Sequence, residues 1–358
     1  MKVGIVGAGN IGLGYAAFLL LNGHDVSIWS PSGARTEALR NGEDLIVTGA
    51  IEGSFSPTIC TSAENLAKAD AIVLALPAYG HRSVLEALIP FVEERHTVII
   101  SGHLSFAALF LAKRLAARGI NIPIVAWSTT VLTGKPRGPN RINVGALRST
   151  VDMATLPASH AARALDVCVG LFGDRFAAKD DILTIALSNI NPQAHLAEAL
   201  LNLTRIERIE SWLQNTMVTS TVGKYIEALD KERLAVANAF GKSVRTIFDH
   251  YRLSYGVTGE SVAEISANQV RGGSDPAGPT GLDTRWITED VPFGIVPTIY
   301  LAKLAGVEVP LHQSSLNIIS ASYGHDFAAD NDLLTEIGPL EVGTMTALMA
   351  SGYANATS

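Results

Sequence analysis

One histidine of the sequence stands in a spacing suited to proton transfer. His195 ends the segment SNINPQAH at 188–195, in which Asn191 is predicted to cap a helix and Pro192 to be its first residue. Asn191 and His195 are four positions apart, so they face the same side of that helix. The positive helix end lowers the pKa of His195, and a nearby carboxylate would raise it toward the pH at which a general acid and base works.

A second segment, TRWITEDV at 284–291, offers both a carboxylate and a substrate anchor. Arg285 carries a planar guanidinium that can bind a substrate carboxylate through two hydrogen bonds, and Thr284 stands beside it. Asp290 could hold the imidazole of His195 in one tautomer. The two segments together predict an acid–base pair next to an anion-binding arginine.

A purely structural alternative stays open for both segments. In it, Asn191 only caps its helix, His195 only packs, and Arg285 forms a surface ion pair with Asp290 or Glu289. Residue spacing alone does not decide between the two interpretations.

A glycine-rich loop near the start of the chain predicts a dinucleotide site. The GxGxxG motif consists of Gly7, Ala8, Gly9, Asn10, Ile11 and Gly12. It follows a predicted strand and opens a predicted helix, which is the context that this motif requires. Gly7 permits the tight turn, Gly9 lets the backbone approach a pyrophosphate, and Gly12 allows the helix to pack on the sheet.

The end of the second predicted strand indicates which dinucleotide is preferred. NAD enzymes usually place an acidic residue here to bind the ribose 2′-hydroxyl. This sequence instead has Ser30, Ser32 and Arg35, which could donate hydrogen bonds and a positive charge to a 2′-phosphate. We therefore predict NADP, as NADPH, with NAD as the second choice. In the alternative, Ser32 caps the next helix and Arg35 is a solvated surface residue.

Polar residues also follow other predicted strands, where doubly wound sheets bind their ligands. Pro77 precedes Tyr79 and His81, and His103 closes the sequence SGH at 101–103. We include Pro77 in the predicted cofactor site. We interpret the two histidines as ordinary loop residues, because neither has a partner motif.

The first half of the chain alternates strand-like and helix-like segments, which is typical of a Rossmann-type doubly wound parallel sheet. Strands are expected at 3–6, 26–29, 71–76, 98–100 and 124–127, with helices at 11–21, 83–92 and 104–117. Residues 45–60 look like an inserted hairpin. The strand-rich stretch 141–156 is expected to form the edge of the same sheet.

The second half is predominantly helical, with helices expected at 192–212, 222–240, 244–255, 298–305 and 311–322. So many glycines and prolines occur in 271–297 that most of this stretch should form a long loop. We predict a dinucleotide-binding domain at 1–180 and an all-α substrate-binding and catalytic domain at 181–358, with the ligand in the cleft between them.

Composition excludes several classes of protein. Hydrophobic residues make up 47% of the 358 positions and charged residues 17%, as expected of a chain with large buried cores. A net charge of −7 disfavours nucleic-acid binding, and two cysteines provide no disulfide framework. No apolar run is long enough to span a membrane. We therefore expect a cytoplasmic protein without a bound metal, and a homodimer.

Several of these segments resemble the NAD(P)-dependent opine dehydrogenases of the octopine and nopaline type, and the N-(1-carboxyethyl)-norvaline dehydrogenase branch most of all. The resemblance covers nearly the whole chain: the glycine loop, SNINPQAH at 188–195, VGKYIEALDKERLAVANAFG at 222–241 and LDTRWITEDVPFGIVP at 282–297. It implies a C-terminal domain like that of 6-phosphogluconate dehydrogenase. Some family members have an aspartate where Ser30 stands, so the resemblance leaves the choice of cofactor open.

The resemblance also implies an activity and roles for residues. His195 and Asp290 would form the proton-transfer dyad, Arg285 would bind the carboxylate of the oxo acid, and Asn191 would lie at the substrate. The reaction would join a pyruvate-like 2-oxo acid to the amino group of an amino acid and reduce the resulting C=N bond. Two alternatives are a reductase of simple 2-oxo or 2-hydroxy acids and a non-catalytic redox sensor that binds NADPH.

Overall fold

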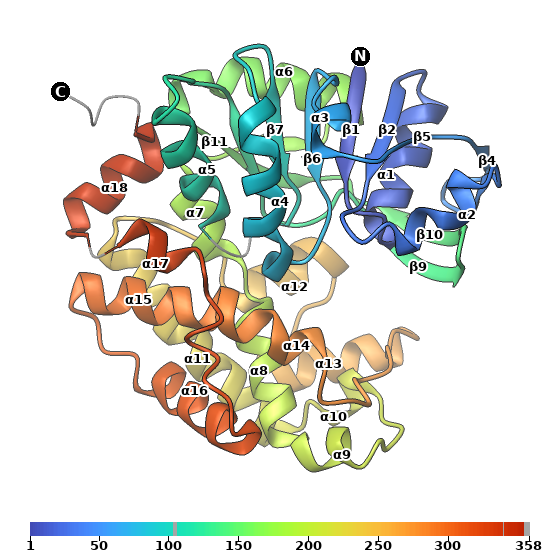
Figure 1. The fold of residues 1–358 in the computed structure, drawn as a ribbon. Helices are drawn as coiled ribbons and strands as arrows, with labels where there is room; N and C mark the ends of the chain where they lie inside the picture. The colour runs from blue at the N-terminus through green and yellow to red at the C-terminus, as the bar shows by residue number, and fades with distance from the viewer. Residues whose placement is uncertain (103–105, 339, 354–358) are drawn as a thin grey trace. The chain divides into compact units, whose positions relative to one another are not determined.

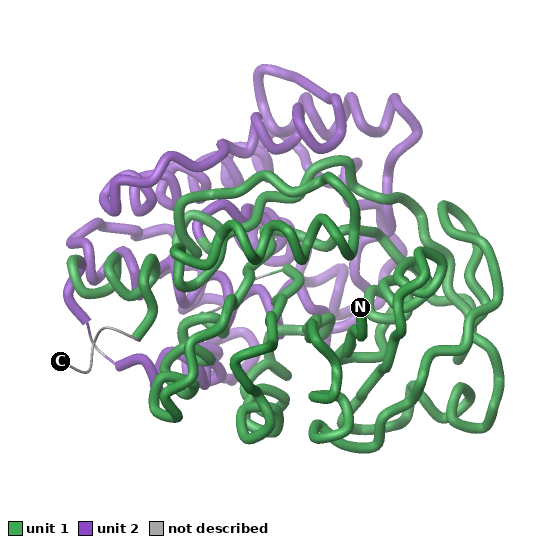
Figure 2. Tube along the Cα trace, turned by 90° about the horizontal axis from the view of Figure 1, so that it is seen from above, with its two compact units in different colours: residues 1–186, 343–358 green, residues 187–342 purple. Residues whose placement is uncertain are grey.

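The computed structural model describes residues 1–102, 106–338 and 340–353, and the chain divides into two compact units. Unit 1 comprises residues 1–186 and 343–358, and unit 2 comprises residues 187–342 (Figure 2). The sequence indicated one division, near residue 180. The second division arises because the last helix returns to unit 1, where Gly352 lies against Ala112 and Leu156.

Unit 1 is built on an eight-stranded sheet with the order β12-β11-β8-β7-β6-β1-β2-β5 (Figure 1). Neighbouring strands are parallel except β8 and β11. All five predicted strands are confirmed, and β1 lies between β2 and β6, where doubly wound sheets bind nucleotides. The bounds are β1 Lys2–Val6, β2 Asp25–Trp29, β5 Thr58–Cys60, β6 Ala71–Leu74, β7 Thr97–Ile100, β8 Ile124–Trp127, β11 Val151–Leu156 and β12 Phe176–Ala178.

A second sheet of four strands belongs to the same unit, with the order β4-β3-β10-β9. Its strands are β3 Leu45–Gly49, β4 Gly53–Phe55, β9 Leu132–Gly138 and β10 Arg141–Leu147. The inserted hairpin is confirmed as β3–β4. The placement of 141–156 at the edge of the large sheet is wrong for its first half, because β10 pairs with β3 and β9 instead. The edge itself is β12.

Helices cover both faces of the large sheet. Figure 1 shows α3, α4 and α5 on one face and α1 and α6 on the other. The second sheet packs on α1, and Gly14 permits this approach, since a Cβ there would lie 2.8 Å from Leu132. The helices of unit 1 are α1 Asn10–Leu21, η1 Ala34–Thr36, α2 Glu37–Arg40, α3 Ala63–Leu66, η2 Ala78–Gly80, α4 His81–Leu88, η3 Ile89–Phe91, α5 Ala107–Ala116, η4 Ala158–His160, α6 Ala161–Phe172 and α18 Val342–Ser351, with α7 Ile182–Ser188 at the boundary.

Unit 2 is helical in its described residues, as the sequence indicated. Helix α8 packs against α11, α14, η5 and α16, with one apolar cluster on each side of it. The predicted helix 192–212 divides at Asn202. The elements are α8 Asn191–Leu201, α9 Leu203–Glu207, α10 Gln214–Met217, α11 Ser220–Ala239, α12 Ile247–Tyr255, α13 Val262–Arg271, α14 Arg285–Thr288, the π-helix η5 Val291–Ile295, α15 Val296–Ala305, α16 Pro310–Tyr323 and α17 Leu334–Ile337.

The glycine- and proline-rich stretch 271–297 is only half a loop, which corrects the sequence-based expectation. Residues 272–284 are irregular, but α14, η5 and the start of α15 follow without a break. Pro292 and Pro297 stand in the first turn of η5 and of α15, and Nδ2 of Asn331 donates to the carbonyl of Pro292, about one turn before Pro297, at 2.8 Å. None of the described helices is both long and apolar enough to cross a bilayer.

Candidate active site

Unit 2 brings together the histidine and the aspartate predicted from the sequence. Nδ1 of His195 lies 2.6 Å from Oδ2 of Asp290, and the two side chains are 23% and 8% exposed. His195 is in the second turn of α8, and Asp290 lies between α14 and η5. These elements approach closely because Gly294 of η5 faces Pro192 of α8, where a Cβ would lie only 2.3 Å from the proline ring.

The pair fixes the tautomer of the imidazole. When Nδ1 donates its proton to Asp290, the neutral ring keeps its lone pair on Nε2. Burial lowers the pKa of His195, but the negative charges of Asp290 and Glu198 outweigh this effect, so its pKa is raised above the usual value of 6.5. The arrangement therefore makes His195 a stronger base than a free histidine side chain.

An aromatic ring stacks on one face of the His195 imidazole. The ring of Trp286 lies parallel to that of His195, with centroids 4.6 Å apart and planes 4° from parallel. Trp286 in turn meets Trp212 edge to face at 6.0 Å. Nε1 of Trp212 donates to the carbonyl of Pro279, and Gly278 lets the backbone lie flat against the indole. The irregular segment therefore acts as a support for the histidine ring.

The start of α8 differs in detail from the prediction. Asn191 is the first helical residue and Ile190 occupies the cap position, which makes no side-chain hydrogen bond. The side chain of Asn189 accepts from the backbone N–H of Asn191 instead, at 3.1 Å. Asn191 is exposed, one turn before His195 on the same face of the helix. Its side chain is therefore open to solvent, and Asn191 does not act as the cap.

Arg285 forms the ion pair that the structural alternative described. Its Nε donates to Oε2 of Glu289 one turn further along, and the side chains are 66% and 3% exposed. Thr284 caps α14 by accepting from the N–H of Trp286 at 3.4 Å. A buried carboxylate thus anchors Arg285 at the surface of the segment that also carries Asp290.

Sequence reasoning missed two residues that touch or surround His195. Glu198 is buried three positions after it on α8, and burial raises the pKa of Glu198 to about 7. The helical spacing of the polar residues Asn191, His195 and Glu198 could have revealed it. No comparable pattern marks Trp286, because its partner is 91 positions away along the chain.

In unit 1, the glycine loop has the geometry that a dinucleotide site requires. Gly7 has a φ of +106°, and a Cβ there would lie 2.6 Å from the carbonyl oxygen of Ala75. A Cβ at Gly12 would lie 2.0 Å from the carbonyl oxygen of Gly7. At Gly9, which caps α1, a Cβ would meet nothing within 4 Å, so the backbone is open to an approaching phosphate.

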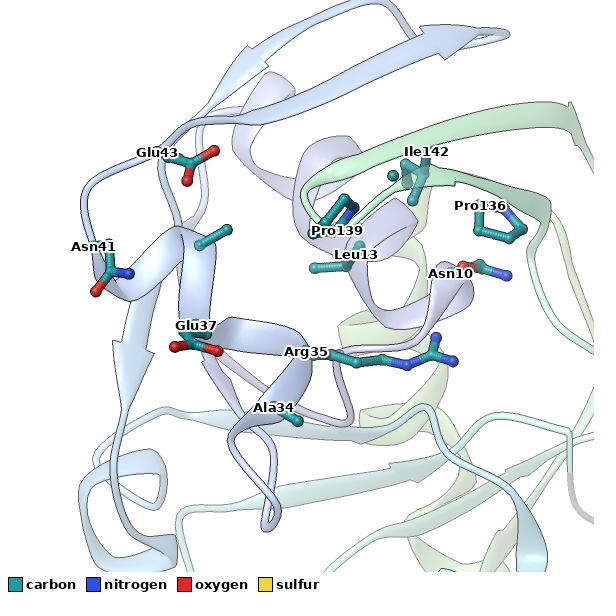
Figure 3. A pocket seen from close by; sticks show the side chains of 13 residues that line it. Asn10, Leu13, Ala34, Arg35, Glu37, Asn41, Glu43, Pro136, Pro139 and Ile142 are labelled. Atoms are coloured by element: carbon teal, nitrogen blue, oxygen red, sulfur yellow. The ribbon is translucent and has the colours of Figure 1, made fainter.

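A pocket of about 570 Å³ begins at this loop. Figure 3 shows the side chain of Arg35 extending toward Asn10, with the β9–β10 turn opposite. The lining residues are Ala8, Asn10, Leu13, Ala34, Arg35, Glu37, Ala38, Asn41, Glu43, Pro136, Gly138, Pro139 and Ile142. Ser30 and Ser32 are not among them. Gly33, not Ser32, stands at the cap of the following turn.

The remaining predicted positions have simpler surroundings. Pro77 caps the 3₁₀ turn η2, and Ile11 packs on the core of unit 1. His81 is buried, its Nε2 lies 3.2 Å from the carbonyl of Leu76, and burial lowers its pKa to about 4. His103 lies outside the described residues. No three acidic, histidine or cysteine side chains gather as a metal site within 1–102, 106–338 and 340–353.

Two families match different parts of the chain. Residues 178–323 match the family described as NAD/NADP octopine/nopaline dehydrogenase, alpha-helical domain. Residues 3–102 match the ketopantoate reductase PanE/ApbA family. The first match contains His195, Arg285 and Asp290, and the second contains the glycine loop.

Whole-chain comparisons agree with this division. An opine dehydrogenase of Arthrobacter sp. (strain 1C) is 30% identical, over 98% of this chain and 97% of that protein. The structure of octopine dehydrogenase in complex with NADH and agmatine has a TM-score of 0.81 at 17% identity, over 97% and 98% of the two chains. Yersinopine dehydrogenase with NADP⁺ bound has a TM-score of 0.74 at 16% identity, over 98% and 97%. At these identities the two structures show a shared fold.

Proposed function

Because this chain belongs to the opine dehydrogenase family, and is thus an oxidoreductase that acts on CH–NH groups, we propose that it condenses a 2-oxo acid with the amino group of an amino acid. The product is an N-(carboxyalkyl)amino acid. The observation that carries the proposal is the His195–Asp290 pair, in which the aspartate holds Nδ1 and the ring remains partly exposed. Arg285, on the same segment as Asp290, supplies the positive charge that an oxo-acid carboxylate needs.

Two proton transfers define the work of His195. Nε2 takes a proton from the ammonium group of the amino acid, so that the amine can attack the carbonyl carbon of the oxo acid. The attack leaves a positive charge on nitrogen and a negative charge on the carbonyl oxygen, and a proton moves from that nitrogen to the oxygen to give a hydroxyl group. Nε2 then returns its proton to this hydroxyl group, which leaves as water while the C=N bond forms. Asp290 stabilises the charged imidazolium between these steps. Bound NADPH supplies the hydride that reduces the C=N bond.

The residues of unit 1 support NADPH as the preferred cofactor. Gly7, Gly9 and Gly12 fit a pyrophosphate, and Arg35 lines the pocket beside the glycine loop. A guanidinium at this position suits a 2′-phosphate. We expect a lower KM for NADPH than for NADH, and we expect Arg35→Ala to remove the difference. Arg82→Ala, an arginine of α4 paired with Glu86, is the matched control. A clear preference of the unaltered protein for NADH would refute this part of the proposal.

The function is tested by following oxidation of NADPH with pyruvate, with and without a panel of amino acids that includes ornithine and norvaline. Oxidation only in the presence of an amine, with a secondary-amine product found by mass spectrometry, would support the condensation. Oxidation by the oxo acid alone would assign a simple reductase. Binding of NADPH without oxidation in the presence of any oxo acid and amine would favour a redox sensor.

A further inference from the structure

A polar stripe runs along one face of helix α8, apart from Gln193, which faces His312 instead. Asn191, His195 and Glu198 follow one another at helical spacing, and the helix carries them from the exposed surface to the interior. Asn191 is exposed, the His195 side chain is 23% exposed, and Glu198 is 1% exposed. Leu196, Ala197 and Ala199 cover the other faces. Glu198 is therefore an acidic group buried directly behind the histidine.

The carboxyl group of Glu198 is incompletely bonded. Its Oε1 accepts from Nε2 of Gln214 at 3.4 Å, whereas the buried Oε2 makes no hydrogen bond to any residue in the described part of the chain. A buried carboxylate is costly unless it is paired or fully hydrogen-bonded. In the described part of the chain, the one hydrogen bond of the carboxyl group is the long one from Gln214, so its charge calls for another explanation.

The charge of Glu198 acts on two titratable groups, His195 and Tyr251 of α12, and raises the pKa of both. Glu198 and His195 each shift the titration of the other, since the carboxylate favours the imidazolium and the imidazolium favours the carboxylate. The other charged groups on the surrounding elements form ion pairs among themselves or, for Arg205, with Glu210. They are Asp290 with His195, Arg285 with Glu289, Asp230 with Arg233, Glu232 with His312, and Arg205 with Glu210.

We propose that Glu198 is a positioning residue for the proton chemistry of His195. Its buried carboxyl group sets how firmly His195 holds a proton. The charge states of the two groups are linked, so that Glu198 is most stable as a carboxylate when His195 is an imidazolium. When Nε2 of His195 gains a proton, Glu198 is driven to lose one, and the reverse holds when His195 returns it. Asp290 orients the ring, whereas Glu198 tunes its affinity for the proton without touching the substrate.

The coupling is a property of unit 2, and only its catalytic consequence rests on the proposed function. Titration of the folded protein without any substrate therefore tests it. The imidazole signals of the protein labelled with ¹⁵N-histidine are followed by NMR from pH 5 to 9, and His195→Gln identifies the signal of His195. Because Glu198→Gln removes a negative charge, we expect it to lower the pKa of His195. Each pH unit of that shift means a tenfold smaller fraction of imidazolium at high pH.

Two further variants keep the test specific. Glu198→Asp retains the charge, so it should leave the titration of His195 closer to that of the unaltered protein than Glu198→Gln does. Glu232→Gln also removes a carboxylate next to a histidine in unit 2, but its partner is His312. That control should leave the titration of His195 in place. An unshifted His195 signal in folded Glu198→Gln would overturn the proposal, as would an equal shift in Glu232→Gln.

Gln214→Leu tests the same coupling with Glu198 still present. The amide of Gln214 stabilises the carboxylate, so its loss raises the pKa of Glu198, weakens the negative charge near His195 and moves the His195 titration in the same direction by less. This variant decides the matter if Glu198→Gln does not fold. With amine-dependent turnover in hand, the acidic limb of kcat/KM, where His195 must lose its proton before it can act as the base, should move to lower pH in both variants. A protein that lacks this turnover but shows the shift would refute the proposed function and keep the coupling.

Discussion

Two histidine–carboxylate pairs of unit 2 join segments that are far apart in the sequence, and they have nearly equal lengths but different surroundings, unlike the exposed local pair of His325 with Asp330. In one, Nδ1 of His195 lies 2.6 Å from Asp290, and in the other, Nδ1 of His312 lies 2.7 Å from Glu232. Both carboxylates come from elements far along the chain from their histidine. Judged by this distance alone, either pair could be a catalytic dyad.

The second ring nitrogen separates the two pairs. Nε2 of the fully buried His312 lies 3.2 Å from Nε2 of Gln193, and Glu232 also accepts the backbone N–H groups of Leu311 and His312. The carboxylate of Glu232 therefore caps the N-terminus of α16, where the first backbone N–H groups of the helix need an acceptor. His195 instead keeps a partly exposed ring beneath Trp286. On the proposed function, the accessibility of the ring, and not the length of the ion pair, separates the histidine that reacts from the one that only supports the fold.

The largest expected effect comes from replacing each of the two histidines with alanine and comparing the losses of turnover and of stability. His195→Ala should lower amine-dependent turnover by about 10²–10⁴-fold, because it removes the general acid and base, and should leave the Kd for NADPH unchanged. His312→Ala should lower the free energy of unfolding by about 1–3 kcal/mol, because Glu232 and Gln193 lose a buried partner. Steady-state kinetics measure the turnover of both variants, and urea unfolding measures their stability. Equal losses of turnover in the two variants would contradict the assignment of His195 as the catalytic histidine and His312 as the structural one.

Arg285 tests whether the exposed side of the reactive pair is the substrate side. Arg285→Leu should raise the KM for the oxo acid by about 10–100-fold, the value of a charge-assisted hydrogen bond. Arg252 is a matched control, since it is also an exposed arginine of unit 2 and is paired with Asp249 at 2.9 Å. Arg252→Leu should leave that KM unchanged. An unchanged KM in Arg285→Leu would mean that the ion pair with Glu289 is only structural.

Glu198 should behave as a destabilising acid at high pH. Burial raises the pKa of Glu198 from 4.5 to about 7, so ionisation costs stability progressively as the pH rises from 4.5 to 7. Glu198→Gln stays neutral, and we expect it to exceed the unaltered protein by about 1–3 kcal/mol in the free energy of unfolding at pH 8. The gain should vanish below pH 4.5. Urea unfolding at several pH values measures it, and a loss of stability at pH 8 would contradict the expectation.

Glu232 should show the opposite sign, by a smaller amount. Burial raises the pKa of Glu232, but its hydrogen bonds with His312 and the backbone outweigh this, and the pKa is lowered below 4.5. The stabilisation is therefore present above pH 4.5 and is lost as the pH falls further. Glu232→Gln should cost about 1 kcal/mol at pH 7, and the difference should shrink in acid. A constant difference from pH 7 to pH 3 would show that the charge of Glu232 is unimportant.

Local pattern determined much of this protein before any tertiary contact was known. The five strands of the parallel sheet are short apolar runs, and the glycines at 7, 9 and 12 act through the backbone over a few residues. The high proline and glycine content of 271–297, by contrast, led to the wrong prediction that most of this stretch is a loop. Proline is well tolerated in the first turn of a helix, and both Pro292 and Pro297 stand there.

Pairing across the chain was decided only by the tertiary structure. The sequence predicted Asp290 as the partner of His195, but it left open whether Arg285 pairs with Asp290, with Glu289 or with a substrate carboxylate. It also gave no sign that β10 leaves the large sheet, since strand pairing depends on a partner some 95 residues away. The residue types and their helical spacing can thus be read from the sequence. The partner, burial and pKa of each group cannot be predicted in this way, because they depend on which distant segments the fold packs together.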